Sequence, residues 1–514
     1  MDRIPGYTIS VKYARLVVTV CASLCAGIAP APAAAQSGTG NAFAAAIDTM
    51  LLREATRVLA ADSLRGRETG SPGGAMAVRY IVRKLRETGL EPGARDGSFT
   101  QPVPIRRVTV DATSQITVGA IAEPFVYGAD FFVTLPDSLR SMPLRGDAWF
   151  AGTPHDAAAA LDPGAARGRF IVVLGALPAR GDTTLAAWAA NGATGVIQLQ
   201  PDSAAWADAF AGTLTPQMRL DDAPPFRPGP PLPVITAGPR LTRALVQGVT
   251  IPAAIAGTPF RAIDLGRDVG ADIRVVRTPI DAVNVVGMLP GSDPALRDRL
   301  IVYAAHYDHL GTGRPDETGD SIYNGFSDDA AGVAMLLSIA DALRREPPAR
   351  SVAFLFLTGE ERGLLGSTHA ARMPPWTGGL DRVDALINLD GGAPPRPPIA
   401  WRFPGGLAPD RTPTRLGTIA DSIDATNGWA TRLETARPIS DFWPFGERGV
   451  PAIFIIPGAE WEDTSKEEHD ALFARWDHYH QPADEYDEDF PFAGIARYAA
   501  LALMLGQAVD ARSR

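Results

Sequence analysis

Residues 300–306 read Leu-Ile-Val-Tyr-Ala-Ala-His, an apolar run that ends directly at a histidine. The apolar part, residues 300–305, predicts a buried strand. Similar runs predict further strands at residues 284–288, 352–357, 385–389 and 452–456. Apolar residues at helical spacing predict a helix at residues 330–345. Strands that alternate with helices indicate an α/β fold, with a mixed β-sheet core covered by helices on both faces.

Residues suited to bind metal ions stand close to these predicted elements. They are His306, Asp328, Glu360, Glu361, Asp390 and His480. His306, the Glu360-Glu361 pair and Asp390 each follow a predicted strand, which is where α/β sheets form their sites. Two imidazoles and three carboxylates can hold two zinc-like ions, and one further carboxylate is left as a general base. The set therefore predicts metal-assisted hydrolysis.

Each residue of this set also has an ordinary structural interpretation. Asp328 precedes a predicted helix and could cap it, and Asp390 precedes a glycine and could belong to a turn. Glu360 and Glu361 could be a solvated pair, and His478 is a competitor of His480 as a ligand. The joint occurrence of these residues at predicted strand ends and loops favours the functional interpretation.

Two more carboxylates stand next to the imidazoles. Asp308 follows His306 by two residues and could accept a hydrogen bond from the second ring nitrogen, which would fix the tautomer. Asp484 follows His480 by four residues and could orient that ring in the same way.

The composition is that of an ordinary globular protein. The chain of 514 residues is 46% hydrophobic and 21% charged, which allows a sizeable core, and its length predicts two or three domains. The net charge of −10 disfavours nucleic acid as a partner, because phosphate binding depends on an excess of lysine and arginine.

The N-terminus has the pattern of a secretory signal peptide, residues 1–35. Basic residues precede an apolar run at residues 16–29, and Ala33-Ala34-Ala35 fits a cleavage site. A membrane anchor would need about 20 apolar residues, so we expect none. Both cysteines, Cys21 and Cys25, lie in this segment. We therefore expect a periplasmic or secreted protein without disulfides, and the mature chain cannot be a cysteine hydrolase.

The remaining chain divides into three parts that differ in residue composition and in the pattern of apolar residues. Residues 36–110 are predicted to be the N-terminal part of the metal-binding domain, with helices within residues 43–89 around a glycine-rich loop. Residues 111–275 are rich in proline, alanine and glycine, contain a strand–helix–strand pattern near residues 170–197, and are predicted to be an inserted, smaller β-rich domain. Residues 276–514 are predicted to complete the metal-binding domain.

Taken together, the motifs resemble one known family. The matching stretches are His306–Gly311, Asn324–Gly332, Gly359–Ser367, Asn388–Asp390, Ser440–Asp441, Gly449–Ala452 and Tyr479–Asp484. This set resembles the di-zinc peptidases of family M28, the aminopeptidase Y and glutamate carboxypeptidase group. The loop Gly66–Gly73 is similar to the opening loop of that family, and residues 111–275 resemble a protease-associated (PA) domain.

The resemblance implies two Zn²⁺ ions, although Mn or Co would also suit these ligands. It implies that His306, Asp328 and Asp390 hold one ion, and that Asp328, Glu361 and His480 hold the other. Glu360 is then the general base that deprotonates a metal-bridged water, and Asp308 orients His306. The resemblance also implies a cis peptide bond between Asp328 and Asp329.

The implied substrate is a peptide. The sequence of the first matching stretch, His306–Gly311, favours an aminopeptidase. Arg437 stands where some family members carry a tyrosine that polarises the scissile carbonyl. It could stabilise the oxyanion or bind a substrate carboxylate. The alternatives are therefore a carboxypeptidase or dipeptidase on the same scaffold, or a non-catalytic, receptor-like binding protein. The oligomeric state stays open.

Overall fold

The computed structural model describes residues 46–137, 140–153, 163–175, 177, 183–200, 206, 217–224, 229–249 and 261–511. The predicted signal peptide, residues 1–35, lies outside this part of the chain. Within the described part, no helix is long and apolar enough to cross a membrane.

The main sheet has nine strands in the order β1-β14-β18-β15-β19-β22-β20-β21, with β2 also paired to β14. They are β1 (Glu91–Pro92), β2 (Thr100–Pro102), β14 (Val283–Leu289), β15 (Leu300–His306), β18 (Ser351–Leu357), β19 (Val383–Leu389), β20 (Ala400–Leu407), β21 (Ala430–Thr435) and β22 (Ala452–Pro457). The central strands β18, β15, β19 and β22 are parallel. Strand β14 pairs antiparallel with β18, so the sheet is mixed, as predicted. All five predicted strands are confirmed.

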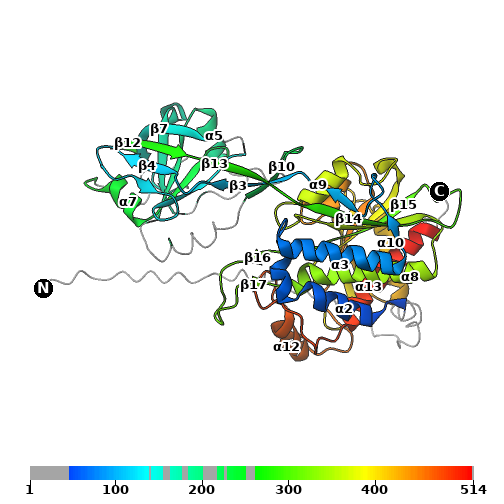
Figure 1. Ribbon diagram of the computed structural model, residues 1–514. Coiled ribbons are helices and arrows are strands. Elements are labelled where there is room, and N and C mark those ends of the chain that lie inside the picture. Colours follow the sequence, from blue (N-terminus) through cyan, green and yellow to red (C-terminus); the bar gives the residue numbers. More distant parts are fainter. Residues whose placement is uncertain are drawn as a thin grey trace. The chain divides into compact units, whose positions relative to one another are not determined.

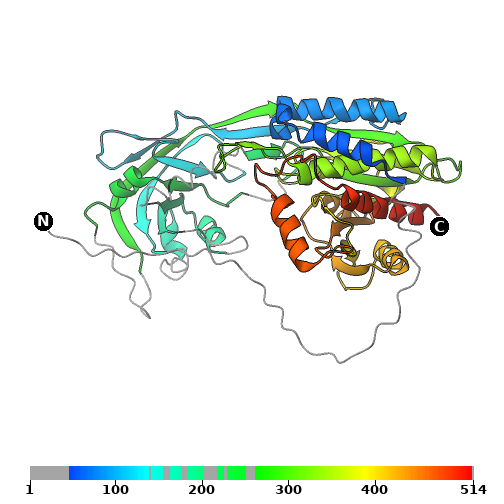
Figure 2. The ribbon, with the colours of Figure 1, turned by 90° about the horizontal axis from the view of Figure 1, so that it is seen from below.

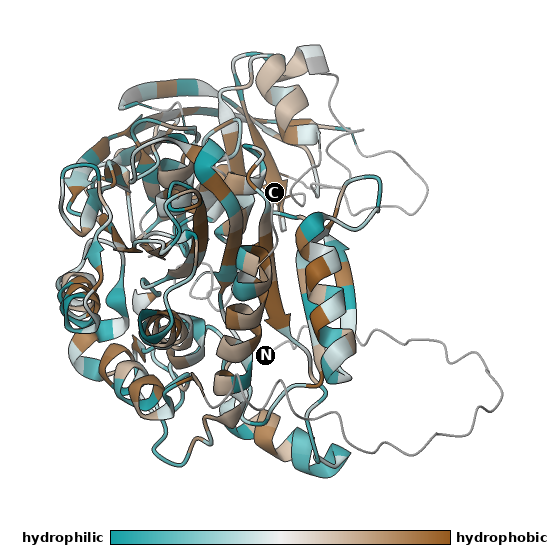
Figure 3. Cartoon of the chain, turned by 90° about the vertical axis from the view of Figure 1, so that its right-hand side faces the viewer, coloured by the Kyte–Doolittle hydropathy of each residue, from teal (hydrophilic) through white to brown (hydrophobic). Residues whose placement is uncertain are grey.

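Helices cover both faces of this sheet. They are α2 (Thr49–Leu59), α3 (Pro72–Thr88), α8 (Ala331–Arg345), α9 (Leu365–Arg372), α10 (Arg415–Asn427), α11 (Phe442–Gly446) and α13 (Ala493–Ala511). A further helix, α12 (Lys466–Trp476), has no buried residue. Successive residues of a strand point to opposite faces. Tyr303 of β15 belongs to the core cluster with α8 and α13, whereas Val302 belongs to a second cluster with α9 and α11. Most strand residues are hydrophobic, as the colouring in Figure 3 shows.

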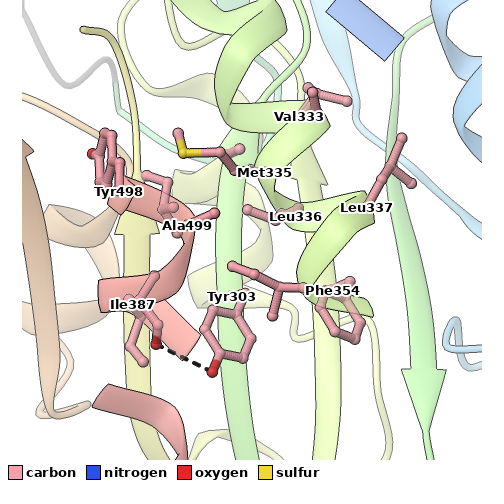
Figure 4. Close-up of a cluster of buried hydrophobic side chains, with 14 of the residues drawn as sticks. Tyr303, Val333, Met335, Leu336, Leu337, Phe354, Ile387, Tyr498 and Ala499 are labelled. Atoms are coloured by element: carbon pink, nitrogen blue, oxygen red, sulfur yellow. Dashed lines mark hydrogen bonds between the residues drawn. The ribbon is translucent and has the colours of Figure 1, made fainter. Parts of the chain in front are cut away.

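The core on the α8 face is closely packed. Met335 and Leu336 of α8 are fully buried and lie in one cluster with Tyr303, Phe354 and Tyr498 (Figure 4). The hydroxyl of Tyr303 donates a hydrogen bond to the carbonyl of Ala502, 3.3 Å away, so this buried phenol is satisfied. The helix at residues 330–345 is confirmed within one residue.

Two N-terminal helices complete this layer. Asp48 caps α2 by accepting hydrogen bonds from two main-chain N–H groups, and Ser71 caps α3 by accepting one, from the N–H of Gly74. Helix α3 ends at Gly89, which has φ +82°, as expected of a C-cap glycine. Both helices lie beside α8 in two perpendicular views (Figures 1 and 2).

Residues 115–273 contain a second, separate sheet of eight strands in the order β5-β4-β12-β7-β8-β9-β11-β6. Its strands are β4 (Gln115–Val118), β5 (Phe125–Val126), β6 (Phe131–Thr134), β7 (Met142–Phe150), β8 (Arg169–Leu174), β9 (Gly195–Leu199), β11 (Val234–Ala237) and β12 (Ile263–Ile273). It has its own hydrophobic clusters, and helices α5 (Thr184–Ala190) and α7 (Pro239–Val246). The predicted strand–helix–strand pattern is confirmed as β8, α5 and β9.

A small three-stranded sheet lies where this β-rich part joins the domain that contains the main sheet. It consists of β10 (Gln217–Leu220), β3 (Ile105–Val110) and β13 (Val275–Ile280). Strands β3 and β13 pair antiparallel along their full lengths, from Val110 opposite Val275 to Ile105 opposite Ile280. The chain therefore leaves and re-enters the main fold at neighbouring points.

Candidate metal centre

The carboxyl ends of the parallel strands bring the predicted site residues together. His306 is the last residue of β15 and lies opposite Leu357, the last residue of β18. Glu360 and Glu361 follow β18, and Asp390 directly follows β19. The site thus lies at the edge of the sheet where the topology predicts it.

A first cluster forms around His306. Its Nε2 atom lies 3.0 Å from Oδ1 of Asp328 and 3.3 Å from Oδ1 of Asp390. The hydroxyl of Ser440 donates a hydrogen bond to the other oxygen of Asp390. His306 is only 1% exposed, so this imidazole is held deep among carboxylates.

A second cluster forms around Glu361. Nε2 of His480 lies 3.3 Å from Oε2 of Glu361 and 3.0 Å from Oδ2 of Asp328. The ring of His309 joins this cluster, with Nδ1 2.7 Å from Oε1 of Glu361. The exposed ring of Tyr479 stacks on His480 with 3.9 Å between the ring centroids.

Asp328 links the two clusters, because its Oδ1 atom faces His306 and its Oδ2 atom faces His480. Donor atoms around one tetrahedral zinc ion, with bonds of about 2.0–2.2 Å, lie roughly 3.3–3.6 Å apart. The donor separations of 3.0 and 3.3 Å in both clusters come close to this range. Oε1 of Glu361 and both ring nitrogens of His309 are buried without a hydrogen-bond partner among the described residues. Two adjacent sites with imidazole and carboxylate donors therefore fit two zinc ions.

The structure corrects one detail of the prediction for Asp308. Nδ1 of His306 is hydrogen-bonded to the main-chain carbonyl of Asp308 at 3.0 Å, whereas the carboxylate lies 3.8 Å away. The carboxylate instead accepts hydrogen bonds from the hydroxyl of Thr69 and from the N–H of Glu360. The prediction was wrong in the atom that it named, because the chain turns after β15 and brings the carbonyl toward the ring.

Asp484 also has a different partner from the one expected. Its carboxylate accepts hydrogen bonds from the N–H and the hydroxyl of Ser327, at 2.9 to 3.1 Å. Its carbonyl accepts the N–H of Phe326. Asp484 therefore ties the loop that carries His480 to the loop that carries Asp328, and it does not orient the His480 ring.

The peptide bond between Asp328 and Asp329 is cis, as the resemblance implied. Asp329 is fully buried, and its carboxylate accepts hydrogen bonds from the N–H groups of His306, Gly332 and Gly391. This side chain joins β15, the start of α8 and the residue after Asp390. A Cβ atom at Gly332 would lie 2.2 Å from the Asp329 carboxylate, which explains why a glycine stands there.

A buried arginine that sequence reasoning missed organises the same loops. The guanidinium of Arg67 donates hydrogen bonds to the carbonyls of Leu59, Tyr307, Asn324 and Gly325, at 2.6 to 2.9 Å. Burial lowers the pKa of Arg67 to about 10, so the side chain remains protonated at neutral pH. It fixes the backbone on both sides of the metal ligands.

The surroundings shift the pKa values of Glu360 and Glu361 in opposite directions. Burial, reinforced by Asp390, Asp441 and Glu361, raises the pKa of Glu360 well above its usual range. Burial acts in the same direction on Glu361, but the adjacent imidazoles of His309 and His480 outweigh it and lower its pKa to about 2. Glu360 is thus a carboxyl group with a high proton affinity beside a carboxylate that stays ionised.

The structure does not place Arg437 in either cluster. Its guanidinium is half-exposed and pairs with Glu434 at 3.3 Å, and the same carboxylate also pairs with Arg402 and Arg432. Its role in substrate binding stays a prediction. His478 likewise lies outside both clusters, with Nε2 hydrogen-bonded to the carbonyl of Arg475.

The sequence of the metal-binding part has relatives. Residues 284–505 match Peptidase family M28. A "probable zinc metalloprotease" of Pyrenophora teres f. teres is 34% identical over 112 residues, which are 22% of this chain and 23% of that protein. A "probable zinc metalloprotease" of Pyricularia oryzae is 32% identical over 143 residues, 28% of this chain and 24% of that protein. The chain thus spans about a quarter of the length of these relatives.

Two solved structures share the fold over most of both chains. An aminopeptidase from Aneurinibacillus sp. strain AM-1 superposes with a TM-score of 0.54 and 16% identity, covering 91% of this chain and 95% of that one. A zinc aminopeptidase from Bacillus subtilis superposes with a TM-score of 0.51 and 16% identity, covering 89% and 94%. At this identity the likeness establishes the fold, which is the predicted mixed α/β sheet with a separate β-rich part.

Proposed function

Because residues 284–505 match Peptidase family M28, we propose that this protein is an exported two-zinc aminopeptidase, which removes residues from the N-termini of peptides. The observation that carries the proposal is the arrangement of Asp328. Its two oxygens face two separate groups of imidazole and carboxylate donors, 3.0 Å from His306 on one side and 3.0 Å from His480 on the other.

Two comparisons and one contact support the finer parts of this proposal. The curated relatives are named zinc metalloproteases, which favours zinc as the metal. The two solved structures that share the fold are aminopeptidases, which favours release of N-terminal residues over release of C-terminal ones. The pairing of Arg437 with Glu434 leaves that guanidinium less suited to bind a substrate carboxylate.

Five of the residues would bind the two metal ions. His306, Asp328 and Asp390 would hold one ion, and Asp328, Glu361 and His480 the other. Bound zinc supplies a Lewis acid that polarises a carbonyl and makes water more acidic. The buried carboxylates and imidazoles set the charge of this site and hold its geometry.

Glu360 moves the proton. Its carboxylate takes a proton from the attacking water as the water oxygen bonds to the scissile carbonyl carbon. It then gives this proton to the leaving amine nitrogen as the C–N bond breaks. A carboxyl group with a raised pKa suits this role, because it is a stronger base than an ordinary carboxylate and can hold the proton until the amine leaves. Asp308 holds this loop in place by accepting the N–H of Glu360.

Peptide hydrolysis tests the proposal directly. The mature chain, loaded with zinc, is offered matched peptides with free and with acetylated N-termini, with and without a chelator. We expect cleavage only of the free-amine peptides, and loss of that cleavage with the chelator. Glu360→Gln, which keeps the shape of the side chain but removes its basicity, is expected to lower kcat by about 10²- to 10⁴-fold. Its zinc content should stay that of the wild type.

The outcomes separate the alternatives. Cleavage of acetylated peptides from the C-terminus would replace the aminopeptidase with a carboxypeptidase, and C-amidated peptides would then resist. A wild-type protein that holds zinc and cleaves no peptide would contradict the enzymatic proposal and favour a binding protein.

Export rests on the sequence of residues 1–35, with its basic start, apolar run and Ala33-Ala34-Ala35. We expect the full-length chain to leave the cytoplasm of a bacterial host and to begin at Gln36 after processing. N-terminal sequencing of the protein from the periplasmic and cytoplasmic fractions checks this. An unprocessed chain in the cytoplasm would contradict export without affecting the proposed chemistry.

A further inference from the structure

His309 is a buried imidazole without an ordinary structural role. It is 0% exposed, and neither ring nitrogen has a hydrogen-bond partner among the described residues. Burying a polar group without a partner costs free energy, and native proteins rarely leave such groups unmatched.

The surroundings of the ring point to a cation. Nδ1 lies 2.7 Å from Oε1 of Glu361 and 4.0 Å from Oδ2 of Asp328. Oε1 of Glu361 is itself buried without an aligned hydrogen bond, so two unmatched ligand atoms face each other. The donor atoms of His309, Asp328, Glu361 and His480 all lie within 4.8 Å of one another. The rings of His309 and His480 meet edge to face, with centroids 5.6 Å apart.

The backbone holds the His309 ring in this position. Gly325 has φ +60°, and a Cβ atom there would lie 2.6 Å from the ring carbons of His309. The Gly325 carbonyl accepts a hydrogen bond from Arg67, which fixes the same loop. The glycine lets the main chain lie close against this side of the ring.

We propose that His309 is a protein ligand of the second ion, beside Asp328, Glu361 and His480. This inference rests on the proposed two-ion function and deepens it. Four protein donors make the coordination of a closed zinc site, whereas the three donors of the first site, His306, Asp328 and Asp390, leave one position open. The two sites are therefore unequal. The second ion therefore binds more tightly, and the open coordination position belongs to the first site.

X-ray absorption at the zinc edge tests the ligand count on the wild-type protein loaded with two zinc ions. We expect scattering from three imidazoles shared by the two ions, those of His306, His309 and His480. A spectrum that fits only two imidazoles would overturn the proposal. This measurement needs no variant and no activity.

Two variants give a second readout. His309→Phe keeps a ring of similar size without a ligand atom, and His478→Ala removes a nearby imidazole that lies outside both clusters. The metal-free proteins are titrated with zinc against a competing chelator. We expect two tight ions for the wild type and for His478→Ala. For His309→Phe we expect one site weakened by more than about 100-fold, the upper range for the loss of a partner that only orients a ligand.

The results keep this inference apart from the proposed function. Two tight ions in a folded His309→Phe protein would overturn the inference, even if the wild type is an active aminopeptidase. Three imidazoles in a wild-type protein that cleaves no peptide would support the inference and contradict the enzymatic proposal. Circular dichroism of metal-free His309→Phe shows whether it folds, and if it does not, the absorption spectrum of the wild type decides.

Discussion

At the scale of single residues, Arg67 shows how much one buried side chain can hold. Its guanidinium binds four main-chain carbonyls, from Leu59, Tyr307, Asn324 and Gly325. Lysine keeps the charge but has only one nitrogen, so Arg67→Lys leaves several of these buried carbonyls without a donor. We expect a loss of about 2–5 kcal/mol in the free energy of unfolding, measured by urea denaturation of the metal-free protein.

The matched control is Arg65→Lys, because Arg65 is exposed in the same loop. It should change stability by less than about 0.5 kcal/mol. Equal stability of the Arg67→Lys and Arg65→Lys proteins would show that the four hydrogen bonds of Arg67 do not hold these loops.

The sequence could name the metal-ligand candidates because all except His480 follow a strand or start a helix. The sequence could not predict the direction of the loops that connect these strands and helices. His309 stands in a short loop whose direction no periodicity gives, and its ring reaches Glu361 only because the chain closes at Gly325. The sequence did not reveal Arg67 for a similar reason, since three of its four partners, Tyr307, Asn324 and Gly325, are about 240 to 258 residues away in the chain. The H-x-x-H spacing of His306 and His309 was the one visible signal for the missed imidazole.

At the scale of elements, the predicted helices and strands are those with a clear apolar pattern. Helix α13 is buried along nearly its whole length, so its sequence is apolar on all sides and has no helical periodicity to detect. Strand β21 has no fully buried residue, because it lies at the edge of the sheet. The formation of α13 and β21 therefore depends on tertiary packing, which a local sequence pattern does not show.

Helix α10 contains a buried acid that makes stability depend on pH. Asp424 accepts a hydrogen bond from Thr431 with one oxygen, while its other oxygen has no partner among the described residues. Burial raises the pKa of Asp424 from 3.8 to about 7. The unfolded chain therefore releases this proton at lower pH than the folded protein does. The stability that the protonated form provides is complete below about pH 4 and is lost as the pH rises to about 7.

Asp424→Asn removes this titration and keeps the shape of the side chain. Relative to the wild type, we expect the variant to gain free energy of unfolding between about pH 4 and pH 8, by up to about 4 kcal/mol. Denaturant unfolding of both metal-free proteins across this range measures the difference. A difference that is constant with pH would show that the folded and unfolded proteins ionise Asp424 alike.

At the scale of the whole molecule, the β-rich part is inserted between two paired strands. Asp111 donates its N–H to the carbonyl of Arg274 at the end of the β3–β13 pair, so the chain enters and leaves at one place. Removing residues 112–273 and joining these ends by an Asn-Gly turn should therefore preserve the hairpin. We expect a folded protein that still binds two zinc ions and cleaves a small aminoacyl substrate.

The same excision should cost stability, because part of the insertion covers the main domain. Met218 and Leu220 of β10 pack with Val103, Ile105 and Leu365, and Asp222 accepts a hydrogen bond from His369 on α9 at 2.8 Å. Losing this cover exposes apolar side chains that contribute about 1.5–3 kcal/mol each when buried. Calorimetry should show a lower unfolding temperature for the excised protein. The full-length variant Met218→Ala should show a smaller decrease of the same kind. If the excised chain binds no zinc while Met218→Ala binds two ions, the insertion is required to fold the metal-binding domain, and residues 112–273 are not a separable domain.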